Sequence, residues 1–126
     1  MKIKIEIDGQ ELTCEGPTLS EKELQLLEDG LSNNDALDGL AEKLSALGHS
    51  SRVKIFAVLS VVTEICVCDI AQILKLTPSA ASQHLAKMRS AKIVQTRKDA
   101  QTVYYSLIDS PLTKSLKNIL FGPSTE

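Results

Sequence analysis

Residues 64–107 read EICVCDIAQILKLTPSAASQHLAKMRSAKIVQTRKDAQTVYYSL, and this stretch decides the fold. Apolar residues recur at helical spacing over residues 69–76, which predicts a short helix there. Thr77 and Pro78 end that helix, because proline lacks a backbone N–H and disfavours helical geometry in the residue before it. Pro78 suits the first turn of a new helix, with Thr77 as its N-cap. The stretch therefore predicts two helices joined by a tight turn.

The second predicted helix, residues 78–90, begins with small and polar side chains and carries larger apolar ones on another face. Short polar side chains allow a helix to enter the major groove of DNA and to meet base edges. After this helix, residues 93–97 and 103–107 alternate like two strands around a polar tip at residues 98–101. Helix, turn, helix and β-hairpin in that order predict a winged helix-turn-helix.

The candidate DNA-binding residues form two chemical groups. Glutamine can bind adenine through two hydrogen bonds, and short polar side chains can meet other base edges. Lysine and arginine neutralise phosphates and so position a protein on the duplex. The residues predicted at base edges are Ser79, Ser82, Gln83 and His84. The residues predicted on phosphates are Lys87, Arg89, Arg97 and Lys98.

The net charge of −2 conceals an uneven distribution of charge along the chain. Residues 1–50 carry four lysines against eleven acids, whereas residues 51–126 carry ten basic residues against five acids. The window 78–98 holds five basic residues and no acid. Phosphate binding requires local positive charge rather than a basic total. The distribution therefore favours DNA binding over a charged face that is merely solvated.

Two cysteines, Cys66 and Cys68, stand just before the first predicted helix, and Asp69 follows them. In an extended segment residues i and i+2 point to the same side, so both sulfurs could bind one ion. A helix N-terminus favours the thiolate, and thiolate pairs select soft ions. The alternative is that both cysteines are buried and act as small apolar residues.

Four segments share a pattern with known regulators: ALGHSSRVKI at 46–55, CVCD at 66–69, SQHLAKMR at 82–89 and VYYSL at 103–107. Together they resemble the arsenic-repressor (ArsR/SmtB) family of winged-helix metal and metalloid sensors, over about half of the chain. The resemblance implies a homodimer joined through its N-terminal and C-terminal helices. It also implies a repressor that leaves its double-stranded operator DNA when As(III), Cd(II) or Pb(II) binds at Cys66 and Cys68.

The resemblance also bears on the other ligands of such an ion. Some members of this branch complete the site with cysteines of an N-terminal arm, often from the other protomer, and here the remaining cysteine is Cys14. Its alternative role is a small apolar residue on the inward face of a hairpin. His49 and His84 are weaker candidates, each more typical of a packed or capping histidine. The second metal site of the family needs Asp and His on the C-terminal helix; that region offers Asp109 but no His, so we expect that site to be absent.

The N-terminal region predicts a hairpin and two helices. Residues 2–7 alternate like a strand, Asp8-Gly9 is a two-residue turn, and residues 10–14 form the return strand. Ser20 and Glu23 form a capping box for a helix that we expect to stop at Gly30. Polar residues at 32–34 can cap a second helix, whose leucine stripe ends at Gly48.

Two further helices flank the predicted DNA-binding stretch. Ser50 or Ser51 is expected to cap a central helix, whose predicted core face is Val53, Phe56, Leu59 and Val62. Ser110-Pro111 begins the last helix, which carries an apolar stripe and is expected to stop at Gly122-Pro123. Apolar stripes on terminal helices of a small domain indicate a dimer interface.

These features predict a mainly α fold with small β elements. Residues 1–48 would form an N-terminal β-hairpin and helical extension, used for dimerisation and as a candidate ligand arm. Residues 49–107 would form the winged helix-turn-helix DNA-binding core, and residues 108–126 a C-terminal dimerisation helix and tail.

Composition excludes several other classes. No apolar run approaches the roughly 18 residues of a membrane span, and an odd count of three cysteines argues against a disulfide framework and for the reducing cytoplasm. No catalytic constellation appears, and a Cys-x-Cys pair lacks the two-residue spacer of thioredoxin-type enzymes. Three alternatives remain open: a regulator switched by thiol oxidation, a regulator without a metal effector, and a winged helix used only for protein contact.

Overall fold

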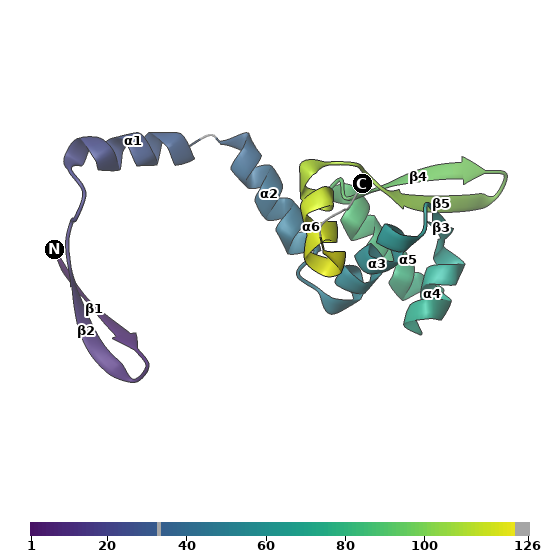
Figure 1. Ribbon diagram of the computed structural model, residues 1–126, viewed down its shortest axis with the longest axis horizontal. Coiled ribbons are helices and arrows are strands. Elements are labelled where there is room, and N and C mark those ends of the chain that lie inside the picture. The colour runs from purple at the N-terminus through teal and green to yellow at the C-terminus, as the bar shows by residue number, and fades with distance from the viewer. Residues whose placement is uncertain (33, 123–126) are drawn as a thin grey trace. The chain divides into compact units, whose positions relative to one another are not determined.

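The computed structural model describes residues 1–32 and 34–122. The chain divides into two compact units, Met1–Leu37 and Asp38–Glu126. Figure 1 labels their helices and strands in chain order. The described chain is mainly helical with small β-sheets, which confirms the predicted fold class.

The first unit begins with a β-hairpin. Strands β1 (Lys2–Ile7) and β2 (Gln10–Glu15) pair antiparallel, with Ile3 opposite Cys14. Asp8 and Gly9 have φ values of 52° and 78°, the positive φ that a tight two-residue hairpin turn requires. The predicted hairpin is therefore confirmed, and its return strand extends one residue further than expected.

Helix α1 (Glu21–Leu31) follows the hairpin. Its capping box is confirmed: the Ser20 hydroxyl accepts from the Glu23 N–H at 3.1 Å, and the Glu23 carboxylate accepts from the Ser20 N–H at 3.2 Å. The predicted stop at Gly30 is wrong, because that glycine continues the helix and Ser32 is the C-cap. No residue of β1, β2 or α1 is buried.

Helix α2 (Asp35–Ala46) spans the boundary between the two units, which falls after Leu37. The Asn34 side chain accepts from the Leu37 N–H at 3.2 Å, in the manner of an N-cap. Asn33, another predicted capping residue, lies outside the described residues.

The second unit contains the helix-turn-helix and its wing. Helices α3 (Ser50–Val61), α4 (Val67–Leu74) and α5 (Pro78–Ser90) pack together, and α6 (Pro111–Phe121) closes the described chain. Strands β3 (Ile65–Cys66), β4 (Val94–Asp99) and β5 (Thr102–Leu107) form an antiparallel sheet in the order β3-β5-β4. The β4–β5 hairpin extends away from the helices (Figure 1). The largest fully buried side chains are Ile55, Phe56, Ile70, Leu85, Met88, Ile93 and Val94.

Helix α3 differs from its prediction at its cap and at its buried face. The N-cap is His49, whose Nδ1 accepts from the Ser51 N–H at 3.1 Å, and not Ser50 or Ser51. Ile55 is buried beside the predicted Phe56, whereas Val53 is 41% exposed. Because α3 is apolar on most of its circumference, residue spacing alone did not identify the side that faces the core.

Helix α4 begins two residues earlier than predicted and ends at Leu74. Lys75 forms a left-handed C-cap with φ 58°, and so the predicted end at Leu76 is wrong. Helix α5 has the predicted bounds, and the Thr77 hydroxyl accepts from the Ala80 N–H at 3.1 Å.

The wing and the last helix follow their predictions with small shifts of boundary. The wing turns at Ala100, where φ is 56°, and its strands extend closer to the tip than expected. Ser110 caps α6 as predicted, and Gly122 is the C-cap. Pro123 and the rest of the predicted tail lie outside the described residues.

Candidate functional site

Helix α5 presents one polar exposed face. Ser79, Ser82 and Gln83 are exposed, whereas Ala81 and Leu85 on the other face are fully buried. Positions three and four apart lie on the same side of a helix, so the three polar side chains share one surface. This arrangement has the form of a recognition helix, in which short polar residues near the N-terminus can approach base edges.

His84 lies on a different side of α5 from this polar surface. It is half-buried, its Nδ1 is 3.1 Å from Nη1 of Arg52, and its ring centroid is 4.7 Å from that of His49. Burial, His49 and Arg52, in that order, lower the pKa of His84 below its ordinary value. The position of His84 favours packing against α3 over the predicted contact with a base edge.

The predicted phosphate-binding residues divide into two sets. Lys87, Arg89 and Lys98 are exposed, and none of them has an ion-pair partner among the described residues. Arg97 is different, because its guanidinium donates to both carboxylate oxygens of Glu64, at 2.6 and 3.1 Å.

The pairing of Arg97 changes the electrostatics at the base of the wing. The hydrogen bond from Arg97 lowers the pKa of Glu64, and Glu64 in turn raises the pKa of Arg97. The guanidinium also lies 4.8 Å from the ring centroid of Tyr104, a cation–π distance. The acid-free window 78–98 did not reveal this pair, because Glu64 lies 33 residues away along the chain.

A polar hollow of about 450 Å³ lies beside α5 and is lined by Ser82, Ala86, Arg89, Ser90 and Tyr105. Sequence reasoning missed Ser90 and Tyr105 as components of this surface. Helical spacing could have found Ser90, because it is four residues after Ala86 and eight after Ser82. Tyr105 comes from β5, so only the tertiary structure brings it to the hollow.

The cysteine pair lies where the sheet meets the helix-turn-helix. Cys66 is half-buried, pairs with Tyr104 across the β3–β5 ladder, and is the N-cap of α4. Cys68 is exposed and lies in the first turn of α4. The expectation of one extended segment through both cysteines is therefore wrong, since the chain turns into helix immediately after Cys66.

Cys66 and Cys68 have the ligand chemistry that suits a soft ion, but two side chains are too few to complete its coordination. Cys66 and Cys68 supply the sulfur atoms that soft ions prefer. Among residues 1–32 and 34–122, no three or more His, Cys, Asp or Glu side chains are grouped so as to hold a metal ion. Complete coordination therefore needs a ligand from outside this pair.

Cys14 belongs to the first unit, Met1–Leu37. It is exposed on β2, opposite Ile3, and borders an apolar hollow of about 450 Å³ together with Leu19 and Leu24. Leu19 and Leu24, which lie on either side of the capping box of α1, therefore share one apolar surface with Cys14.

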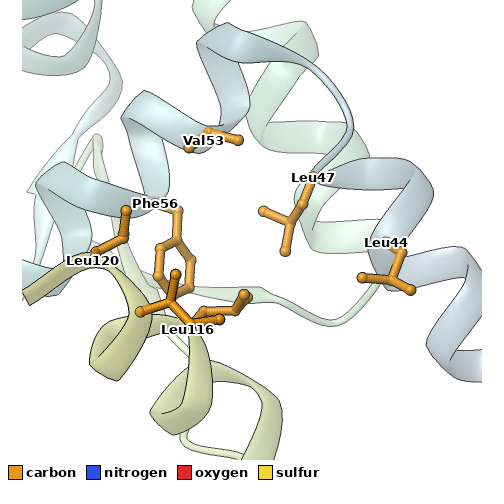
Figure 2. Close-up of a pocket in the computed structure, with 7 residues that line it drawn as sticks. Leu44, Leu47, Val53, Phe56, Leu116 and Leu120 are labelled. Carbon is orange, nitrogen blue, oxygen red and sulfur yellow. The ribbon is translucent and has the colours of Figure 1, made fainter. Parts of the chain in front are cut away.

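An apolar hollow of about 290 Å³ lies between α2, α3 and α6 in the second unit. Figure 2 shows its lining side chains, among them Leu44, Phe56 and Leu116, converging from these three helices. Leu44 and Ile119, which also line it, are 52% and 76% exposed. The surface of α2 and α6 therefore leaves an apolar area uncovered.

The sequence model of a family described as "Bacterial regulatory protein, arsR family" matches residues 49–96. The cadmium resistance transcriptional regulatory protein CadC homolog of Staphylococcus aureus is 36% identical over 96 residues, which span 76% of this chain and 78% of that protein. The chain belongs to the ArsR family. The family resemblance noted in the sequence is thereby confirmed, and the chain is a winged-helix transcriptional regulator and not an enzyme, as predicted.

Two other ArsR-like proteins are similar over most of the chain. The transcriptional repressor SmtB homolog of Synechocystis is 33% identical over 97 residues, covering 77% of this chain and 73% of that protein. The solved structure of HlyU from Vibrio cholerae has 36% identity and a TM-score of 0.61, and covers 71% of this chain and 94% of that one. None of the described helices combines the length and apolar character that crossing a membrane requires.

Proposed function

We propose that this protein is a homodimeric transcriptional repressor that a thiophilic metal or metalloid ion releases from its operator DNA in the reducing cytoplasm. The observation that carries the proposal is the place of Cys66, which belongs to β3 and occupies the N-cap position of α4. Strand β3 pairs with β5 of the wing, and α4 packs against the recognition helix α5. An ion held by Cys66 and Cys68 would thus act on both DNA-binding elements.

The release follows from the geometry of the helices. Drawing two sulfurs toward one ion moves the first turn of α4, and α5 moves with it because the two helices pack together. In a dimer this changes the spacing of the two recognition helices, which must match successive turns of the major groove. An ion that favours the non-binding state by roughly 2–3 kcal/mol lowers DNA affinity about 30- to 150-fold.

The exposed apolar surface of α2 and α6 supports the homodimer. Residues such as Leu44, Ile119 and Leu120 are exposed in one chain, and a second copy would cover them. The CadC relative is named for cadmium resistance, which supports a metal effector. The SmtB relative is named a transcriptional repressor, which supports the role of repressor. The proposed effectors are As(III), Cd(II) and Pb(II), because sulfur ligands select soft ions.

Cys14 is proposed as the third sulfur ligand, from either protomer. Because Cys66 and Cys68 alone leave an ion under-coordinated, the remaining cysteine of the chain is the natural addition. Asp69 is the alternative ligand, since it follows Cys68 directly.

The proposed DNA interface combines the exposed polar and basic residues described above. Ser79, Ser82 and Gln83 meet base edges, while Lys87, Arg89 and Lys98 bind phosphates. Arg97 joins the phosphate-binding set when it leaves Glu64. Each phosphate that these side chains neutralise releases counterions, so the affinity for DNA falls as the salt concentration rises. A flat salt dependence would favour a winged helix that serves only protein contact.

The experiment titrates reduced protein on operator DNA with As(III), Cd(II), Pb(II) and Zn(II), while sulfur-to-metal charge-transfer absorption is recorded. Cys66→Ser should bind DNA as the parent does but remain bound when the ion is added. One equivalent of ion should protect three thiols from alkylation, and Cys14→Ser should weaken ion binding at least about tenfold, about 1.4 kcal/mol. Normal ion-induced release of Cys66→Ser would exclude this site, and unchanged alkylation of Cys14 would exclude it as a ligand.

A switch based on thiol oxidation is the second candidate. The exposure of Cys68 and the partial exposure of Cys66 favour it, as does a related structure named "Reduced HlyU" from Vibrio cholerae. Mild oxidation followed by mass spectrometry tests it directly. Loss of DNA binding with a modified Cys66 or Cys68, in the absence of any ion, would favour oxidation over metal as the signal.

A further inference from the structure

A polar cluster joins the recognition helix to the start of α3, away from the exposed face of α5. Arg52 on α3 donates through Nε to the backbone carbonyl of Ala46 at the end of α2. Its Nη1 lies 3.1 Å from His84 Nδ1 on α5. The His49 ring, at the cap of α3, lies 4.7 Å from the His84 ring. One guanidinium of α3 therefore contacts two other helices, α2 and α5.

The contact between Arg52 and His84 depends on the protonation of the imidazole. Arginine is only a donor, so His84 must accept at Nδ1, and it can do so only while that nitrogen carries no proton. The groups that face His84 are His49 and Arg52, and both lower its pKa after the larger effect of burial. No carboxylate of the described α3, α4 or β4, the elements packed against α5, contributes to this shift.

Protonation of His84 therefore has a defined consequence. It replaces an accepted hydrogen bond with two cations in contact, and no carboxylate among residues 1–32 and 34–122 contributes to the pKa of His84 in a way that would offset the repulsion. Because the folded pKa lies below the ordinary 6.5, the bridge is intact above that pH and is lost as the pH falls through the lowered value.

We propose that Arg52 and His84 are positioning residues for DNA binding, and that their bridge orients α5 until His84 takes a proton. Neither residue needs to touch DNA for this role, since His84 lies toward the buried face with Ala81 and Leu85. The inference uses only DNA binding by the winged helix and is independent of the proposed ion. DNA affinity should therefore decrease in mild acid even when no metal is present.

The chain contains two histidines, which provide a matched pair of variants. His84→Gln keeps an acceptor but does not titrate, and His49→Asn keeps a capping side chain and removes the other imidazole. The probe is a duplex that the reduced, metal-free protein selects from a random pool, and affinity is measured at constant salt from about pH 7.5 to about one pH unit below the His84 midpoint that NMR gives. The parent and His49→Asn should both lose roughly tenfold in affinity, the variant at a higher pH because His49 lowers the pKa of His84, whereas His84→Gln should change less than about twofold.

A second measurement does not depend on the folding of any His84 variant. NMR titration of the parent should give His84 a midpoint below 6.5, and this midpoint should coincide with the loss of DNA affinity. Arg52→Gln removes both bonds of the bridge and should weaken DNA binding already at neutral pH, equally on all sequences. A parent whose DNA affinity does not follow the His84 titration would overturn the proposal, as would His84→Gln with the pH profile of the parent.

Discussion

The two units of the chain differ in what holds their elements together. In Met1–Leu37 the hairpin and α1 contain no buried residue, and Ile5 and Leu12 are 40% and 39% exposed. In Asp38–Glu126 side chains such as Leu85 and Ile70 are fully buried. Both units have well-formed turns and caps. Local hydrogen bonds can therefore define an element, but burial of apolar surface must supply most of its stability.

Charge divides the two units as well. Residues 1–37 carry three lysines against nine acids, whereas residues 38–126 carry eleven basic residues against seven acids. Since DNA attracts local positive charge, this division supports the proposal that the second unit binds DNA. The experiments below test this contrast, beginning with the largest expected effect.

Leu85→Ala and Leu12→Ala compare burial in the two units. Leu85 is 0% exposed, so its truncation should reduce the free energy of unfolding by about 2–5 kcal/mol. Leu12 is 39% exposed on the hairpin, and its truncation should change that free energy by less than about 0.5 kcal/mol. Urea denaturation measures both. A large loss in Leu12→Ala would show that this face of the hairpin is covered by a partner in solution.

Gln83→Ala tests sequence reading by the second unit. If Gln83 binds a base edge, its removal should reduce discrimination between operator and mutated site by about 1–3 kcal/mol. The control is Arg89→Ala, which should weaken binding by a similar factor on all sequences, because phosphates carry no base information. Competition binding on a panel of single-base operator variants measures both effects. An unchanged preference in Gln83→Ala would mean that the exposed face of α5 is placed wrongly on DNA.

Glu64→Gln should have the smallest effect on DNA affinity, and it acts by releasing the Arg97 guanidinium from its ion pair. Without the Glu64 carboxylate, the Arg97 guanidinium keeps only the longer 4.0 Å contact with Asp99 and becomes available to a phosphate, so DNA affinity should rise by roughly two- to threefold. The slope of log affinity against log salt should steepen by about 0.9 for the added phosphate contact. Arg97→Ala is the matched control, and adding it to Glu64→Gln should abolish the gain. A gain that persists in the double variant would assign the effect to the lost negative charge alone.

The Glu64–Arg97 pair also has a defined pH dependence. Because the Arg97 hydrogen bond lowers the pKa of Glu64 below 4.5, the pair contributes stability above that pH. This contribution is lost as the pH falls through the lowered value. The stability of Glu64→Gln should therefore vary less than that of the parent over this acidic range.

Much of the local structure was predictable from short stretches of sequence. Thr77-Pro78 predicted the start of α5, Asp8-Gly9 predicted the hairpin turn, and the capping box at Ser20 was correct. The start of α4 was not predictable in the same way, because β3 forms by pairing with β5 almost 40 residues later. The prediction that α1 stops at Gly30 was wrong, because glycine permits a left-handed cap but does not require one.

The candidate site shows the same difference between local features, which the sequence predicted, and long-range contacts, which it did not. Composition and periodicity alone indicated an exposed polar face on α5 and identified the cysteines at the start of α4, since these features depend on residues within a few positions of one another. Only the tertiary structure paired Arg97 with Glu64, turned His84 toward Arg52 and brought Tyr105 beside α5. Each of these contacts joins residues about 15 to 33 positions apart, so it depends on how the helices and the sheet pack and not on local backbone preference.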